Sequence, residues 1–283
     1  MKLGPWCVER GVRLPSLRRI LVAGAPIAPA LHRTFRDVLR VGAELHTPYG
    51  ATEALPVATI GSNRVLAETA ARTASGAGTC VGQLAPGMRV RIMKPTDGPV
   101  AQWSDALGLP VGEIGEIVVR GEVVTRDYKG EPDQTAAAKL IEVEPDGTAH
   151  VLHRMGDLGY LDAQGLLWFC GRKSHRVVGA DGQVWTTDPV EGIFNEHPDV
   201  YRTALIGVAG QPRLAVELRP GRQRDQAELA AELRALGRPH AITAAVRAFH
   251  VHPAFPVDVR HNSKIERLQL AAWAGGQTPV EVA

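Results

Sequence analysis

The chain has 283 residues, of which 45% are hydrophobic and 22% charged, so it can bury one large core or two smaller ones. The formal net charge is only +2 and its basic residues are interspersed with acidic ones, so the sequence lacks the charge pattern of a nucleic-acid-binding protein. No run of about 18 apolar residues is present, so no membrane span is predicted, and three scattered cysteines predict reduced thiols in a cytoplasmic protein.

The first residues alternate between strand and helix patterns, which predicts parallel α/β structure. Residues 18–26 (RRILVAGAP) predict a buried strand that ends in a Gly-Ala-Pro turn. Residues 30–40 place apolar side chains on one helical face, and residues 43–50 predict the next strand.

After Gly78 the pattern changes to short strands, which predicts a β-subdomain with one helix at residues 132–140. The expected strands cover residues 88–93, 115–121, 150–154, 159–162 and 166–171. A second change in composition places a domain boundary near residues 171–175.

The C-terminal part predicts a smaller α+β domain. A helix is expected to begin with a capping box at residues 188–191, in which Asp188 is the cap and Glu191 follows three residues on. Another helix passes through residues 229–236. Strands are predicted at residues 203–208, 213–220 and 245–252. The last helix is expected to open with a capping box at residues 263–266.

The segment HTPYGATEALP carries the first group of chemically useful side chains. Tyr49 offers a flat face for a base, and Gly50 lets a ligand approach the backbone. Thr52 can donate to a phosphate oxygen, and Glu53 can hold a hard cation such as Mg²⁺. These residues alone favour the alternative of a plain turn with a solvated glutamate.

Three further residues are candidates for nucleotide binding. Asp157 lies between glycines before an expected strand, where it could accept from both ribose hydroxyls or simply belong to a turn. Arg172 lies at the expected domain boundary, where an arginine is usually a surface charge. Lys264 is expected at the first position of the last helix, where a cation is mildly unfavourable unless an anion joins it.

The combination of these motifs resembles the adenylate-forming superfamily, which includes acyl-CoA synthetases, luciferases and adenylation domains of peptide synthetases. The matching elements, in the order seen in that superfamily, are residues 24–26 (GAP), 49–53 (YGATE), 156–157 (GD), 171–172 (GR) and Lys264. The resemblance covers nearly the whole chain. The wording of YGATEALPVA, WFCGRKSHRVVG and RHNSKIERLQLAAWA is most similar to the β-lactone synthetases of bacterial long-chain olefin biosynthesis.

The resemblance implies a fold, a domain division and a nucleotide site. Residues 1–170 would be the C-terminal part of a large AMP-binding domain with a β-subdomain, residues 171–175 a hinge that contains Ser174, and residues 176–283 a small mobile domain. The implied nucleotide-binding residues are Gly24, Ala25 and Pro26 in the adenine pocket, Tyr49 and Gly50 beside them, and Asp157 and Arg172 on the ribose.

The implied chemistry uses ATP and Mg²⁺. Glu53 would hold the Mg²⁺, Thr52 would contact the α-phosphate, and Lys264 would bridge the substrate carboxylate and the α-phosphate. The reaction implied is adenylation of a 2-alkyl-3-hydroxy fatty acid, followed by internal attack of its 3-hydroxyl to close a β-lactone with release of AMP. Assembly with other enzymes of the olefin pathway is a further implication.

Departures from the superfamily pattern keep two alternatives open. Met155 replaces the usual threonine before Gly-Asp, Ser174 stands at the hinge position, and residues 176–184 lack the Ile-Lys of coenzyme A ligases. These differences weaken the first alternative, a fatty acyl-CoA synthetase. The second alternative is an inert fragment or docking module.

A phosphate loop rich in Ser, Thr and Gly and ending near Pro-Lys is expected well before Gly24, but only 23 residues precede that glycine. Residues 73–82 (TASGAGTCVG) have no lysine and do not match this loop. The chain is therefore expected to be the C-terminal part of a longer protein and to be inactive alone.

Overall fold

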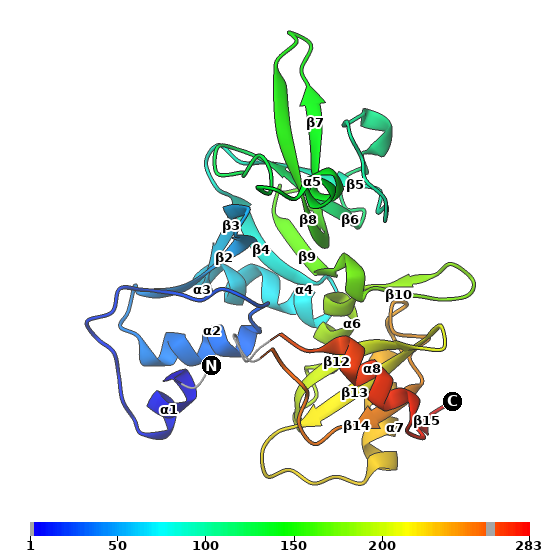
Figure 1. The fold of residues 1–283 in the computed structure, drawn as a ribbon. Helices are drawn as coiled ribbons and strands as arrows, with labels where there is room; N and C mark the ends of the chain where they lie inside the picture. Colours follow the sequence, from blue (N-terminus) through cyan, green and yellow to red (C-terminus); the bar gives the residue numbers. More distant parts are fainter. Residues whose placement is uncertain (1–2, 259–263) are drawn as a thin grey trace. The chain divides into compact units, whose positions relative to one another are not determined.

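The computed structural model describes residues 3–258 and 264–283 (Figure 1). The chain divides into two compact units, each described by itself below. Unit 1 consists of residues 1–70 and 79–169, and unit 2 of residues 71–78 and 170–283. Across the described residues, no helix combines the length and the apolar character that a membrane crossing requires.

Unit 1 begins with the expected strand–helix–strand order. After α1 (Leu3–Glu9), β1 (Arg19–Leu21) runs parallel to β2 (Glu44–Ala51), and α2 (Pro29–Val38) connects them. The buried side chains of Phe35, Leu39 and Leu45 pack α2 against the strands. The expectation of a buried first strand is wrong, because β2 is the one described strand that pairs with β1, and Leu21 is 68% exposed.

The rest of unit 1 extends this sheet with antiparallel strands. They are β3 (Ala54–Gly61), β4 (Thr79–Leu84), β5 (Arg89–Met93), β6 (Gly115–Arg120), β7 (Lys139–Val143), β8 (Ala149–Leu161) and β9 (Leu167–Arg172). The nine strands follow the order β1-β2-β3-β4-β9-β8-β6-β5, with β7 paired to β8. Helical segments join β3 to β4 as α3 (Ser62–Arg64), a π-helical turn (Val65–Thr69) and α4 (Ala70–Ala74).

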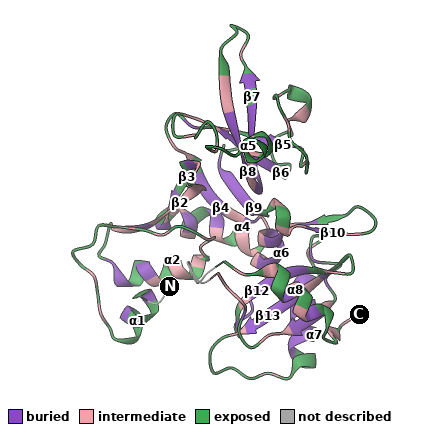
Figure 2. Ribbon diagram, in the orientation of Figure 1, coloured by how far each residue is buried: buried purple, intermediate pink, exposed green. Residues whose placement is uncertain are grey.

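The β-subdomain has its own core, which appears as buried segments of β3, β4, β8 and β9 in Figure 2. Val57, Ile117 and Leu167 are fully buried there. Two expectations need correction. The strands expected at 150–154 and 159–162 are one continuous strand, β8, and α5 (Pro132–Ala138) ends where β7 begins.

Unit 2 is a four-stranded sheet with helices on both faces. Its strands are β12 (Val200–Val208), β13 (Gln211–Leu218), β14 (Ala248–Val251) and β15 (Val280–Glu281), and a small hairpin pairs β10 (Val177–Val178) with β11 (Val184–Trp185). Leu205 packs with α6 (Thr187–Phe194) and α7 (Gln226–Gly237) on one face. Its neighbour Ile206 packs under α8 (Arg267–Gly275) on the other, as the alternation of a strand requires.

Two expected helix starts in unit 2 are wrong. Asp188 lies inside the first turn of α6, and the residue before that helix is Thr186. The capping box expected at residues 263–266 does not open a helix, because α8 begins at Arg267 and Glu266 makes no side-chain capping bond. Ser263 lies outside the described residues.

Candidate active site

The YGATE segment forms the hairpin between β2 and β3. Ala51 pairs with Ala54, so Thr52 and Glu53 are the two residues of the turn. A β-carbon added to Gly50 would collide with the carbonyl oxygen of Ala54. The glycine is therefore required by the close approach of the two strands.

Tyr49 and Asp157 are brought together although 108 residues separate them in sequence. The Tyr49 hydroxyl donates to Asp157 Oδ2 at 2.7 Å, and the Tyr49 ring centre lies 6.0 Å from that of Phe169. Asp157 is 5% exposed and lies inside β8. The expectation that this residue lies before a strand is therefore wrong. The structure thus joins two of the residues predicted to contact the nucleoside.

The Gly24–Pro26 turn follows β1 on the carboxyl side. Because β1 and β2 are parallel and the Val22 N–H donates to the His46 carbonyl at 3.0 Å, this turn and the YGATE segment both follow the carboxyl ends of neighbouring strands. Ligands of α/β sheets bind at such strand ends. Gly24 has φ of +99°, a conformation that favours glycine.

Glu53 has a partner that sequence reasoning missed. The hydroxyl of Tyr128 donates to Glu53 Oε1 at 2.7 Å. This hydrogen bond is the main cause that lowers the pKa of Glu53, while burial and the Glu53 charge raise the pKa of Tyr128 to about 12. At neutral pH the glutamate is therefore an anion and the tyrosine a neutral donor, an arrangement that fits a hard cation such as Mg²⁺.

The remaining predicted site residues belong to unit 2. Arg172 is exposed and ends β9, directly before a 3₁₀ turn (Lys173–His175) that contains the exposed Ser174. Lys264 is also exposed, but it is not the first residue of a helix. The Asp258 N–H donates to the Lys264 carbonyl at 2.9 Å, beside a bridge between Val257 and Ile265. The helix-dipole argument for Lys264 therefore fails, because the lysine lies three residues before α8.

A buried ion pair holds the chain just after Lys264. Arg267, the first residue of α8, donates to Glu191 Oε1 at 2.5 Å and to Glu191 Oε2 at 3.0 Å. The same Glu191 accepts from the Leu205 N–H at 2.8 Å. Burial acts to lower the pKa of Arg267, but the Glu191 charge outweighs it and the pKa is raised. Glu191 was predicted to belong to a capping box, and it instead fastens α6 to α8.

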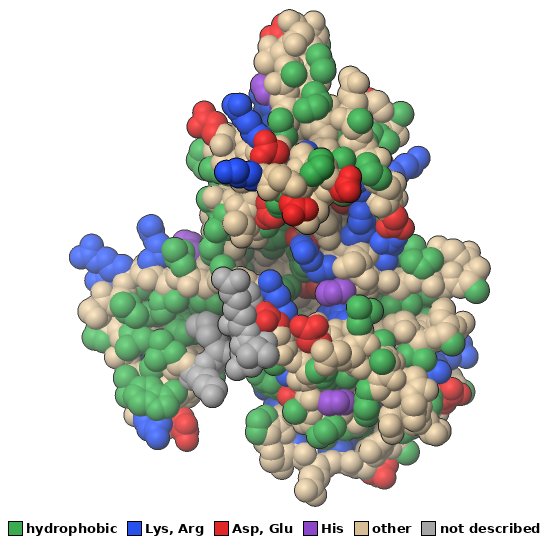
Figure 3. All heavy atoms as spheres, in the orientation of Figure 1, with side chains coloured by type: hydrophobic (Ala, Val, Ile, Leu, Met, Phe, Trp, Pro, Cys, Tyr) green, Lys and Arg blue, Asp and Glu red, His purple; other side chains and the backbone are tan. Residues whose placement is uncertain are grey.

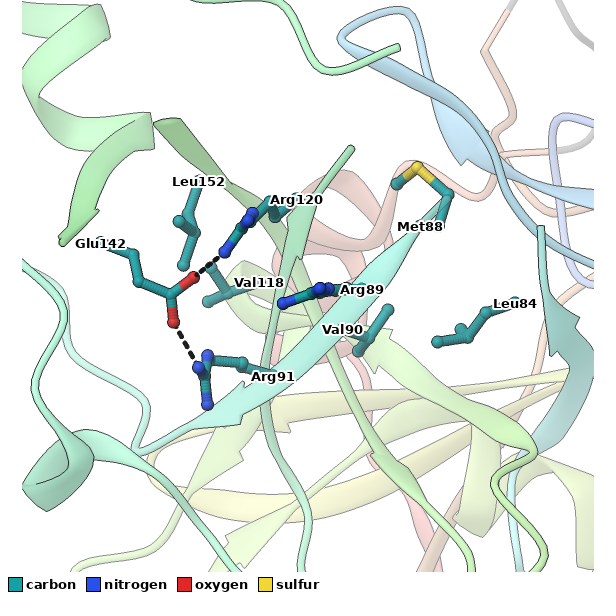
Figure 4. A pocket seen from close by; sticks show the side chains of 9 residues that line it. All are labelled: Leu84, Met88, Arg89, Val90, Arg91, Val118, Arg120, Glu142 and Leu152. Carbon is teal, nitrogen blue, oxygen red and sulfur yellow. Dashed lines mark hydrogen bonds and ion pairs between the residues drawn. The ribbon is translucent and has the colours of Figure 1, made fainter. Parts of the chain in front are cut away.

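A separate cavity of about 340 Å³ lies in the β-subdomain (Figure 4). Arg91 and Arg120 both point toward Glu142 and pair with it. The lining is Leu84, Met88, Arg89, Val90, Arg91, Val118, Arg120, Glu142 and Leu152, so it contains other residues than those predicted for the nucleotide. We interpret this cluster as a structural ion-pair network.

Hydrophobic side chains gather on the surface of the α1–α2 part of unit 1 (Figure 3). Leu3, Trp6 and Val8 of α1 are about half exposed. Leu3, Trp6 and Val8 are not among the residues predicted to contact nucleotide.

The chain resembles known proteins in sequence and in structure. A family model described as AMP-binding enzyme matches residues 4–129. An olefin β-lactone synthetase from Stenotrophomonas maltophilia is 49% identical over 273 residues, which are 95% of this chain and 49% of the relative. A second protein of that name, from Xanthomonas campestris, is 48% identical over 95% of this chain and 49% of its own length.

Among solved structures, the amide bond synthetase McbA from Marinactinospora thermotolerans superposes with a TM-score of 0.69 at 26% identity. The match covers 91% of this chain and 47% of McbA. The chain thus spans about half the length of the curated relatives it matches. Sequence and fold agree, and the chain belongs to the AMP-binding enzyme family.

Proposed function

We propose that this chain carries part of the active site of an ATP-dependent, AMP-forming ligase that converts a 2-alkyl-3-hydroxy fatty acid into a β-lactone. The observation that supports it most is the 49% identity, over 95% of the chain, to a protein named olefin β-lactone synthetase. The hydrogen bond between Tyr49 and Asp157 adds support, because it joins two residues suited to hold the adenine and the ribose.

The first step would be adenylation. A carboxylate oxygen of the fatty acid attacks the α-phosphorus of ATP, a new P–O bond forms, and the bond to pyrophosphate breaks. The exposed ammonium of Lys264 would neutralise charge between carboxylate and α-phosphate, and Thr52 would donate to an α-phosphate oxygen. Glu53 would hold Mg²⁺, which when bound offsets the charge of the phosphates.

The second step would need no further substrate. The 3-hydroxyl oxygen attacks the acyl carbon, the hydroxyl proton is lost to solvent, and the bond to AMP breaks as the four-membered lactone closes. Both groups belong to one molecule, so the attack benefits from a high effective concentration. This chemistry agrees with the absence of the Ile-Lys pattern of coenzyme A ligases in residues 176–184.

The test is a product assay. The chain is joined to the part of the Stenotrophomonas relative that it does not match, and the chimera receives ATP, Mg²⁺ and the hydroxy acid without any thiol. We expect a β-lactone by mass spectrometry, and its formation should be roughly 10²–10³ slower in the Lys264→Ala chimera. A thioester that forms only when coenzyme A is added would instead support an acyl-CoA synthetase.

We further propose that the 283 residues do not complete adenylation alone, because they contain no loop rich in Ser, Thr and Gly that ends in Pro-Lys. Backbone amides and a lysine of such a loop commonly hold the departing phosphates. Carboxylate-dependent pyrophosphate release by the unfused chain, at the rate of the chimera, would contradict this proposal.

A further inference from the structure

The turn that carries Glu53 is fastened to a segment far away in the sequence of unit 1. The Tyr128 hydroxyl donates to Glu53 Oε1 at 2.7 Å, and the Thr125 N–H donates to the Glu53 carbonyl at 2.9 Å. One contact holds the side chain of the glutamate and the other its backbone. The segment 125–128 therefore holds both the side-chain carboxylate and the backbone carbonyl of Glu53.

The fastening segment is itself anchored. Lys139 is only 6% exposed, and its Nζ donates to Thr125 O at 2.6 Å and to Thr125 Oγ1 at 2.9 Å. The same Nζ lies 5.6 Å from the centre of the Tyr128 ring, within reach of a cation–π contact. The Tyr128 N–H in turn donates to Thr135 Oγ1 of α5 at 3.0 Å. Burial of a lysine ammonium costs free energy unless hydrogen bonds compensate it, and here the two oxygens of Thr125 provide them.

The chemistry of the donor decides what this arrangement does to Glu53. A lysine or arginine in the place of Tyr128 would cancel the carboxylate charge, whereas a phenol hydroxyl orients the carboxylate and leaves the charge in place. Tyr128 occupies Oε1, and among the described residues no side chain donates to Oε2. The carboxylate therefore offers one defined oxygen to a cation.

We propose that Tyr128 is a positioning residue that holds the Glu53 carboxylate so that Oε2 faces the divalent cation of the bound nucleotide. The inference rests on the proposed function, because that function supplies the cation. It adds a residue, and a loop, to the metal-binding part of the site. Lys139 and Thr125 take part as supports of that loop.

The test measures cation binding, not turnover. Binding of Mn²⁺ to the 283-residue chain in the presence of ATP is followed by electron paramagnetic resonance for the wild type, Tyr128→Phe and Glu53→Gln. Partners of metal ligands typically contribute 10- to 100-fold in affinity, so we expect Tyr128→Phe to weaken Mn²⁺ by about 10-fold. Tyr201→Phe is the matched control, since this half-exposed tyrosine lies in unit 2.

A second measurement distinguishes positioning of the metal ligand from a purely structural role of Tyr128. Binding of AMP without any cation and the thermal midpoint of unit 1 should be the same in Tyr128→Phe and wild type. A variant that weakens AMP as much as Mn²⁺, or that unfolds unit 1, overturns the inference.

The two proposals fail in different ways. If Glu53→Gln weakens Mn²⁺ but Tyr128→Phe does not, the positioning role is wrong and the proposed function stands. If the wild type and Glu53→Gln show the same Mn²⁺ signal, Glu53 is not the metal ligand and the positioning role of Tyr128 is overturned. The proposed function fails separately, if the chimera forms no β-lactone from ATP, Mg²⁺ and the hydroxy acid.

Discussion

The Glu191–Arg267 pair allows a quantitative prediction for unit 2. Glu191→Gln removes the charge that Arg267 contacts through two hydrogen bonds, while the nearly isosteric amide keeps the packing of α6. Both side chains are close to 90% buried, so Arg267 would be left as a largely desolvated cation. Breaking one partner of a buried pair typically costs about 3–5 kcal/mol, so we expect a loss of this size in the unfolding free energy of unit 2.

The assay is hydrogen exchange read by mass spectrometry over a urea series, because peptides from the two units report separately. Peptides of α6, β12 and α8 should lose protection together, and peptides of unit 1 should not change. Glu232→Gln is the matched control, since Glu232 pairs with Arg224 on the surface of the same unit and should matter much less.

A double variant tests the electrostatic cause. In Glu191→Gln/Arg267→Met the buried cation is removed as well, so the double variant should be more stable than the sum of the single losses predicts. The reasoning is refuted if Glu191→Gln costs less than about 1 kcal/mol. It is also refuted if the loss of unfolding free energy in the double variant equals the sum of the losses in Glu191→Gln and Arg267→Met.

Three further variants follow from the geometry. Gly50→Ala places a methyl group against the Ala54 carbonyl, so we expect a loss of about 1–3 kcal/mol in the stability of unit 1, measured by urea unfolding, and an unchanged midpoint would contradict the fit. His32 has its pKa lowered from 6.5 to about 4 by burial, so the unfolded state binds more protons between these values. Stability from this residue is present above pH 6.5 and lost as pH falls toward 4, by about 3 kcal/mol at most, and His32→Gln should flatten the pH dependence of urea unfolding. Lys264→Ala should slow adenylation in the chimera by roughly 10²–10³ in a pyrophosphate-release assay without changing stability, because the side chain is exposed.

The sequence predicted those elements whose pattern is local. The helical face of residues 30–40 and the strand at 43–50 depend on neighbouring apolar residues, and both were confirmed as α2 and β2. The pairing of Tyr49 with Asp157 could be anticipated only from the resemblance, because no local pattern links residues 108 positions apart.

Failures arose where long-range contacts outweigh a local signal. Residues 263–266 match a capping box, yet Ile265 bridges Val257 and the helix starts later. Glu191 likewise matched a capping position, but a buried arginine 76 residues away takes its carboxylate. Tyr128 carried no signal at all, since the Glu53 carboxylate to which it donates lies 75 residues earlier in the sequence.

The backbone around Lys264 is held by hydrogen bonds, whereas the side chain of this lysine is exposed. The Asp258 N–H donates to the Lys264 carbonyl, the Glu266 N–H donates to the Pro256 carbonyl, both at 2.9 Å, and Arg267 is fixed to Glu191. The ammonium is exposed on a backbone that unit 2 holds in place, so it is free to meet an anion without rearranging its own support.

Two variants of the chimera should therefore behave differently in pyrophosphate release. Lys264→Ala should lower the rate while unit 2 stays folded, because only the transition-state charge loses its partner. Glu191→Gln, measured at a temperature where unit 2 is still folded, should lower the rate less, since the lysine is present but its backbone is less well held. If Glu191→Gln under these conditions keeps the full rate, the ion pair stabilises unit 2 without contributing to the position of Lys264.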